Sequence, residues 1–149
     1  MQIGQKGLDL IKSFEGFRAN AYPDPATGAL PYTIGYGTTL YPDGKKIKLG
    51  DKCTKEQALE WLTVDCNRRA AAIGQLDVNQ NQFDAVVSFC YNLGLGAFNK
   101  STLRKKIIRN PNDPTIRDEF NKWVTAAGMK MAGLVRRRKA EADLYFTPL

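Results

Sequence analysis

Apolar residues near the start of the chain recur every three positions. Leu8, Ile11 and Phe14 fall within residues 3–15, and this spacing places them on one face of an amphipathic helix. Gly16 follows directly and predicts the end of that helix, because glycine is favoured just after the last helical turn. We therefore expect a first helix that ends at about residue 15.

Helical spacing returns after residue 50. Thr54 and Gln57 form the pattern of a capping box, in which each side chain bonds to a free backbone N–H of the first turn. The segment 79–94 is so rich in apolar residues that it predicts a helix of the core. Together, the expected helices of this part of the chain span residues 54–74, 79–94, 101–109, 113–126 and 131–146.

Residues 17–50 differ from the rest of the chain. They carry four prolines and five glycines between short aromatic and β-branched pieces, which predicts a small sheet rich in turns. The expected class is α+β, and we expect a single domain over residues 1–149. A β-rich lobe (17–50) would be joined by a connecting helix (54–74) to a larger helical lobe (75–149), with the first helix packed on the latter. A cleft between two such lobes is the usual place for a site.

Charge and composition limit the chemistry. The chain has 22 basic and 15 acidic residues, a net charge of +7, which favours anionic partners such as nucleic acid, anionic lipid or an acidic polymer of the cell wall. Histidine is absent, so a Cys–His nucleophile is excluded and acid–base chemistry depends on Asp, Glu, Lys, Tyr or Cys.

The cysteines and the N-terminus indicate where the protein is made. Three cysteines without a short paired spacing are typical of reduced thiols in a protein made in the cytoplasm, although a Cys53–Cys66 bridge stays open as an alternative. The first residues lack the pattern of a secretory signal, and no apolar run has the length needed to span a membrane. We therefore expect no membrane anchor.

Two carboxylates and a hydroxyl stand out in the segment 14–39. Glu15 is expected at the C-terminal end of the first helix between two phenylalanines, where the helix dipole and the apolar neighbours disfavour an anion. Asp24 lies between two prolines on a stiff loop, and Thr33 lies on a predicted strand. A proton donor, an ionised carboxylate and a hydroxyl that holds water are the parts of an inverting glycosidase. From spacing alone, the commoner interpretation is a solvated acid at a helix end and an ordinary turn.

These residues also carry a family resemblance. The segment "FEGFRANAYPDPATGALPYTIGYGTT" resembles the active-site segment of phage lysozymes, the endolysins of glycoside hydrolase family 24. Glu15 and Asp24 are separated by the eight residues of the family pattern, and Thr33 begins "TIGYG" after a turn longer than that of some members. Thr38 stands where many members carry histidine. The segments 79–103 and 123–145, the latter with "GL-x-x-RR-x-x-E", resemble the central helix and the closing segment of the family.

The resemblance implies a role for each matched catalytic residue. Glu15 would protonate the glycosidic oxygen. Asp24 would activate or orient the attacking water and stabilise the oxocarbenium-like transition state, and Thr33 would help to position that water.

Four further residues are candidates for substrate binding. The resemblance places Asn92 as a cleft-facing amide, with a solvated or capping amide as the alternative. It also places either Arg137 or Arg138 beside the catalytic glutamate, where an ion pair would oppose the effect of the helix end. Among the tyrosines, Tyr32 is the one that we expect to face the cleft, although most aromatic residues of a small domain belong to the core.

The resemblance implies a function and its partners. The chain would hydrolyse the β-1,4 bond between N-acetylmuramic acid and N-acetylglucosamine of peptidoglycan, with inversion, as a monomer without metal or cofactor. It would accumulate in the host cytoplasm and act at the periplasmic cell wall after a holin-type partner permeabilises the membrane. Two other hypotheses are a non-catalytic wall-binding module and a nucleic-acid binder. The basic run at 135–141 raises the second of these, but no nucleic-acid module is recognisable.

Overall fold

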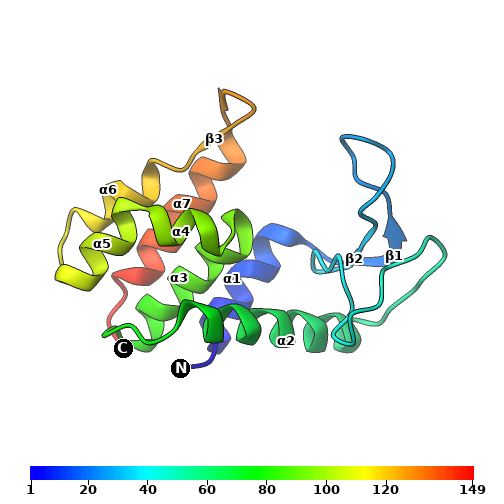
Figure 1. The fold of residues 1–149 in the computed structure, drawn as a ribbon, viewed down its shortest axis with the longest axis horizontal. Helices are drawn as coiled ribbons and strands as arrows, with labels where there is room; N and C mark the ends of the chain where they lie inside the picture. The colour runs from blue at the N-terminus through cyan, green and yellow to red at the C-terminus, as the bar shows by residue number, and fades with distance from the viewer.

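Seven helices and two small antiparallel sheets make up the computed structural model, which describes all 149 residues (Figure 1). Most of the helices lie together at one end of the molecule, β1 and β2 lie at the other, and α2 runs from one end to the other (Figure 1). In chain order, the elements are α1 (Gln5–Glu15), β1 (Arg18–Tyr22), β2 (Thr33–Gly35), α2 (Lys55–Ile73), α3 (Gln80–Leu93), α4 (Leu95–Lys100), α5 (Thr102–Arg109), α6 (Ile116–Asn121), β3 (Thr125–Ala126), β4 (Met129–Lys130) and α7 (Ala132–Tyr145).

The helix ends follow from local sequence signals. α2 begins with a complete capping box between Thr54 and Gln57, and α3 begins with a second one between Asn79 and Gln82. α1 ends at Gly16, whose φ of 70° lies in the left-handed region that glycine adopts without strain. Except for the helix expected at 113–126, the predicted helices are confirmed, with ends within two residues of the expected positions.

α3 is the centre of the core. All ten residues from 81 to 90 are buried, because this helix packs against α1, α2, α4 and α7 at once. Phe89 illustrates the packing, since its ring contacts Phe98, Phe120 and Trp123 edge-on at centroid distances of 6.2, 5.9 and 5.5 Å. The segment expected to form a core helix does so.

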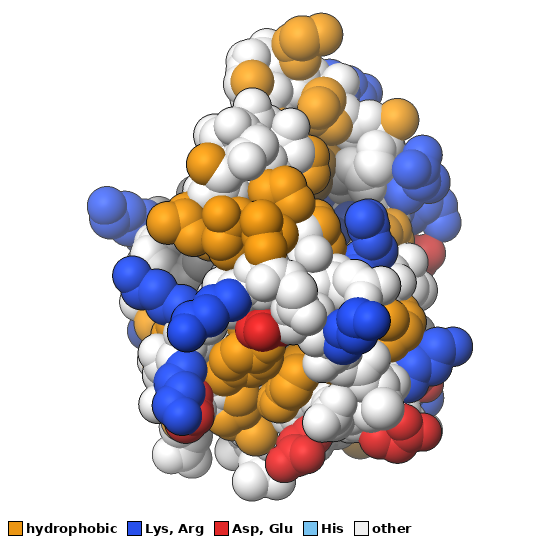
Figure 2. All heavy atoms as spheres, turned by 90° about the vertical axis from the view of Figure 1, so that its right-hand side faces the viewer, with side chains coloured by type: hydrophobic (Ala, Val, Ile, Leu, Met, Phe, Trp, Pro, Cys, Tyr) orange, Lys and Arg blue, Asp and Glu red, His pale blue; other side chains and the backbone are white.

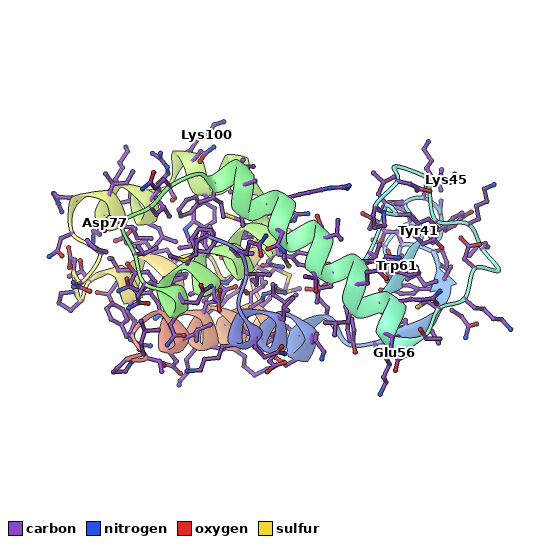
Figure 3. All side chains as sticks on the ribbon, turned by 90° about the horizontal axis from the view of Figure 1, so that it is seen from below. Tyr41, Lys45, Glu56, Trp61, Asp77 and Lys100 are labelled. Carbon is purple, nitrogen blue, oxygen red and sulfur yellow. The ribbon has the colours of Figure 1, made fainter.

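The region from residue 17 to residue 53 has little regular structure. β1 and β2 pair with Tyr22 opposite Thr33, and the rest of the region is held by isolated bridges such as Leu40 with Lys46. α2 supports this region: Tyr41 packs edge-on against Trp61 at 4.9 Å, and the helix continues into the helical part (Figure 3). The predicted α+β class, a small sheet beside a larger helical part, is confirmed.

The helix predicted at 113–126 is wrong in its second half. α6 ends at Asn121, and the chain then forms the hairpin β3–β4. Ala127 and Gly128 have φ of 52° and 76°, so the two-residue turn needs left-handed backbone at both positions. Alanine gives no sequence signal for that turn. α4 is a second difference, because no helix was expected between residues 95 and 100.

The three cysteines are free, so the alternative Cys53–Cys66 bridge is not formed. Cys66 and Cys90 are buried in the helical core, and burial raises the pKa of each thiol to about 12.

Among the helices, none combines the length and the apolar character needed to cross a membrane.

Candidate active site

Glu15 is the last residue of α1, and its side chain is 23% exposed. The guanidinium of Arg137, on α7, donates a hydrogen bond from Nη1 to Glu15 Oε2 at 2.6 Å. Arg137 and Arg138 were the two candidates for this contact, and the structure shows that Arg137 makes it. Because Arg137 is itself buried, little water screens the pair, and the contact defines the orientation of the carboxylate.

The other side of the Glu15 carboxylate faces the backbone of the β region. A Cβ atom placed on Gly37 would lie 2.7 Å from Glu15 Oε1 and 3.2 Å from the hydroxyl of Tyr91. That hydroxyl donates a hydrogen bond to the carbonyl of Tyr36 at 2.8 Å, which ties α3 to the same loop. Burial raises the pKa of Tyr91, so its hydroxyl stays protonated and can donate. Position 37 therefore requires glycine, because a side chain there would collide with Glu15 and Tyr91.

A cluster of buried charges lies behind Arg137. Glu141 accepts a hydrogen bond from the Ser88 hydroxyl at 2.6 Å and contacts Nε of Arg137 at 3.4 Å and Nε of Arg138 at 3.1 Å. Arg138 in turn donates to Oδ1 of Asn92. Burial raises the pKa of Glu141, and the nearby Arg138 and the Ser88 hydroxyl act in the opposite direction.

Asp24 is held in a different way, by its own loop. Its carboxylate accepts the backbone N–H of Ala26 at 2.8 Å, and its backbone N–H and C=O bond to Ala29 and Gly28 at 3.0 and 2.7 Å. This pattern is an Asx turn, in which a side-chain oxygen replaces a backbone carbonyl. The side chain is half-buried, and no cation pairs with it, so the carboxylate is fixed without being neutralised.

Thr33 and Tyr32 lie on the far side of the same loop. Thr33 is the first residue of β2 and stands opposite Tyr22, two residues before Asp24, so the β1–β2 pairing brings Thr33 near the start of the Asp24 loop. Both Thr33 and Tyr32 are half-buried. Tyr32 lines a hollow of about 340 Å³ together with Leu30, Pro31, Thr39, Leu40, Lys46 and Ile47.

Glu15 opens into a pocket of about 580 Å³ at the junction of α1, α3, α7 and the β3–β4 hairpin. A hollow of similar volume, about 550 Å³, lies beside the C-terminal part of α2, but no acidic or basic side chain lines it. Of these two largest hollows, only the first is lined by acidic and basic side chains, and it is therefore the candidate site. Its lining consists of Phe14, Glu15, Asn92, Ala126, Met131, Ala132, Gly133, Leu134, Arg136 and Arg137.

The structure brings part of the predicted set together. Glu15, Asn92 and Arg137 line one pocket, whereas Tyr32 lines a separate hollow of the β region. The expectation that Arg138 contacts substrate needs correction, because its side chain has no exposed surface and points to Glu141 and Asn92.

Some residues of the site were missed by the sequence reasoning. Ser88 and Glu141 hold Arg137, and the hairpin residues Ala126 and Met131 form a wall of the pocket. Two signals in the sequence point to the first pair: Ser88 interrupts the apolar run of residues 85–90, and Glu141 stands four residues after Arg137 on the same helix face. Nowhere do three or more Cys, Asp or Glu side chains gather in a way that could hold a metal ion.

A helical body with a small sheet and an acidic side chain at the end of its first helix defines a lysozyme-like protein. The chain belongs to the phage lysozyme family, whose sequence model matches residues 12–141. The endolysin of Bacillus phage B103 is 40% identical over 150 residues, which cover 99% of this chain and 55% of that protein. The chain thus spans about half the length of this relative. The endolysin of Salmonella phage P22 is 35% identical, with 99% of each chain covered.

The fold has a solved counterpart. The endolysin from Escherichia coli O157:H7 phage FAHEc1 superposes with a TM-score of 0.85 at 41% identity, covering 98% of this chain and 94% of that one. The resemblance inferred from the three sequence segments is confirmed by these comparisons.

Proposed function

We propose that this chain hydrolyses the β-1,4 bond between N-acetylmuramic acid and N-acetylglucosamine of peptidoglycan, as an endolysin that lyses the host cell. The observation that carries the proposal is Glu15, a helix-terminal carboxyl that opens into the only described pocket pairing a carboxyl with a buried guanidinium. Membership of the phage lysozyme family supports the substrate class.

The proposed reaction is a single displacement with inversion. Glu15, protonated, gives its proton to the glycosidic oxygen as the C–O bond breaks, and the leaving sugar departs as an alcohol. Asp24, ionised, takes a proton from a water that attacks the anomeric carbon from the opposite face, and Thr33 holds that water. Inversion requires roughly 6.5–9.5 Å between the two carboxyl groups, which leaves room for the water.

The surroundings of the two carboxylates differ. Glu15 lies against Arg137 and Gly37 in a partly enclosed pocket, whereas the Asp24 carboxylate accepts one backbone N–H, that of Ala26, at the start of an exposed loop. We assign the carboxyl in the pocket as the proton donor and the loop carboxylate, which water can reach, as the group that accepts a proton from water. The side chain of Asn92, fixed by Arg138 at the pocket wall, would contact the substrate.

The proposal includes partners and place of action. Lys and Arg side chains flank an apolar area on the face of the β region (Figure 2), and the net charge of +7 would draw the protein to the anionic wall. The protein would act as a monomer at the periplasmic cell wall. It would reach the wall from the host cytoplasm after a holin-type protein has permeabilised the membrane.

Glu15→Gln tests the proposal, with Asp9→Asn as the control because Asp9 is an exposed acid on the same helix. The measurement is loss of turbidity of permeabilised Gram-negative cells, with circular dichroism on each protein. We expect the wild type and Asp9→Asn to clear the suspension, and a folded Glu15→Gln to be at least about 10³-fold slower. If all three sediment with walls and none clears them, the chain is a wall-binding module.

The stereochemistry needs a separate measurement. Proton NMR of a short glycan during hydrolysis shows which anomer of the new reducing end forms first. Inversion of the β bond gives the α-anomer first. The β-anomer as the first product would contradict single displacement and assign a nucleophilic role to Asp24.

A further inference from the structure

Glu141 is a buried carboxylate that the proposed reaction does not use. It lies on α7 with no exposed surface, so it can touch neither substrate nor bulk water. Three groups surround it: the Ser88 hydroxyl at 2.6 Å, Nε of Arg138 at 3.1 Å and Nε of Arg137 at 3.4 Å. Burial raises the pKa of Glu141, and the two guanidinium groups and the hydroxyl donor act in the opposite direction.

Each of the two arginines leads from Glu141 to a side chain of the pocket wall. Arg137 donates to Glu15, and Arg138 donates to Asn92. Glu15 and Asn92 come from different helices, α1 and α3, and both line the pocket. The Glu141 carboxylate therefore contacts both arginines of α7 that reach side chains of the candidate site.

A buried ion cluster of this kind is not explained by stability alone. Removing charges from water costs free energy, and apolar residues of similar volume often fill such a place at no loss of stability. Glu119 offers a contrast within the same chain. It is also buried, but its partners Lys106 and Lys122 lie on α5 and next to α6, and they hold those helices together away from the pocket.

The charges of the cluster balance when Glu15 is ionised. Glu15 and Glu141 are opposed by Arg137 and Arg138, and the groups that face Glu15 from other helices are Arg137 on α7 and the neutral Tyr91 on α3. Without the charge of Glu141, two guanidinium groups would face one carboxylate. The excess positive charge would favour ionised Glu15, and a general acid must hold its proton.

We infer that Glu141 is a positioning residue of the site. Through Arg137 it orients Glu15, and its charge offsets part of the positive charge that the two guanidinium groups place near Glu15. Through Arg138 it orients Asn92. Ser88 is the second part of this support, because its hydroxyl fixes the same carboxylate oxygen that Arg137 contacts. The inference rests on the proposed function, since Glu15 is the proposed proton donor whose carboxyl it positions.

Glu141→Gln tests the inference, because glutamine keeps the shape and removes the charge. Glu119→Gln is the matched control, a buried carboxylate with two basic partners outside the pocket. Both variants are expected to melt at lower temperature than the wild type. Only Glu141→Gln is expected to lower kcat at neutral pH, by about tenfold, with the alkaline limb of the kcat profile moved about one unit to lower pH. Equal kcat and equal pH profiles in the two variants would overturn the inference.

Ser88→Ala gives a milder variant in case Glu141→Gln fails to fold. We expect a kcat a few-fold below that of the wild type, with a change of the pH profile in the same direction. A profile identical to that of the wild type would count against the positioning role.

A second readout is independent of catalysis. The nitrogen-15 resonance of the Arg137 Nε–H, identified by its loss in Arg137→Lys, reports whether Glu141 holds the guanidinium. It should move or broaden in Glu141→Gln and stay unchanged in Glu119→Gln. If the wild type hydrolyses no glycan, the proposed function fails, and this resonance still decides whether Glu141 holds Arg137. If the Arg137 resonance is unchanged in Glu141→Gln, Glu141 does not orient Arg137 and the inference is wrong.

Discussion

The helical body and the β region hold their carboxylates by opposite means. Glu15 depends on Arg137, 122 positions away in the chain, and on a loop glycine that makes room for it. Asp24 depends on Ala26, Gly28 and Ala29, all within five positions. The position of the proposed acid, Glu15, therefore depends on tertiary packing, and the position of the proposed base, Asp24, depends on a local turn.

The two regions differ in packing as well. The main apolar core has 22 buried residues, and Tyr36 is its one member between residues 17 and 53. The β region is instead held by backbone bonds, isolated bridges and its contacts with α2. A change at Asp24 should therefore alter chemistry without altering the fold, whereas a change around Glu15 should alter both.

The largest effect that tests this contrast is expected from Asp24→Asn. An asparagine oxygen can accept the Ala26 N–H in the same turn, so the loop and the melting temperature should be unchanged while the charge is lost. We expect lysis at least about 10²-fold slower than that of the wild type, measured by turbidity and thermal melting.

Asp43→Asn is the control for this substitution. Asp43 accepts the N–H of Lys45 at 2.9 Å in the same kind of turn, in the same region. Lysis by Asp43→Asn should equal that of the wild type. If Asp24→Asn behaves like Asp43→Asn, the two-carboxylate mechanism is contradicted.

A smaller effect is expected from Gly37→Ala, with Gly28→Ala as its control. Both glycines have left-handed φ, 83° and 68°, so alanine costs about 1–2 kcal/mol of stability at either place. Only at Gly37 would the new methyl group meet Glu15 and Tyr91, since nothing lies within 4 Å at Gly28. We expect Gly37→Ala to melt at a lower temperature than Gly28→Ala because of this added clash, and kcat to be about tenfold lower for Gly37→Ala alone. Equal kcat values would show that the contact with Glu15 is unimportant.

The smallest effect concerns thiol reactivity, which compares the packing of the two regions directly. Cys66 and Cys90 lie in the helical core with pKa values raised to about 12 by burial, whereas Cys53 is half-buried at the edge of the β region. Because the thiolate is the reactive form, Ellman's reagent at pH 8 should titrate one thiol in the native protein and three in guanidinium chloride. Three reactive thiols under native conditions would mean that the helical core opens readily.

Local signals were enough to predict most of the fold. Capping boxes, glycine stops and apolar spacing located the long helices, because each of these signals acts within one or two turns. The hairpin after α6 was missed, since Ala127 adopts a left-handed backbone conformation that alanine does not favour. The residues Glu15, Asp24 and Thr33 could be proposed from the motif, and Asp24 could also be placed on its turn.

The contacts of the site could not be predicted to the same extent. Arg137 and Arg138 are neighbours of equal type, and only the direction of each side chain from α7 decides which one meets Glu15. Ser88 and Glu141 are 53 positions apart, and their contact depends on how α3 packs against α7. Such pairings follow from the packing of helices and have no signature within a short window.

The close approach of Gly37 to Glu15 places the acid on the boundary between the two regions. Its helix belongs to one region, and the backbone that covers one of its oxygens belongs to the other. Any opening of the β region away from α1 would admit water to that oxygen, and any closing would remove it. The contact of this oxygen with water is thus linked to the distance between the two regions, so a small shift of the β region would reach the acid directly.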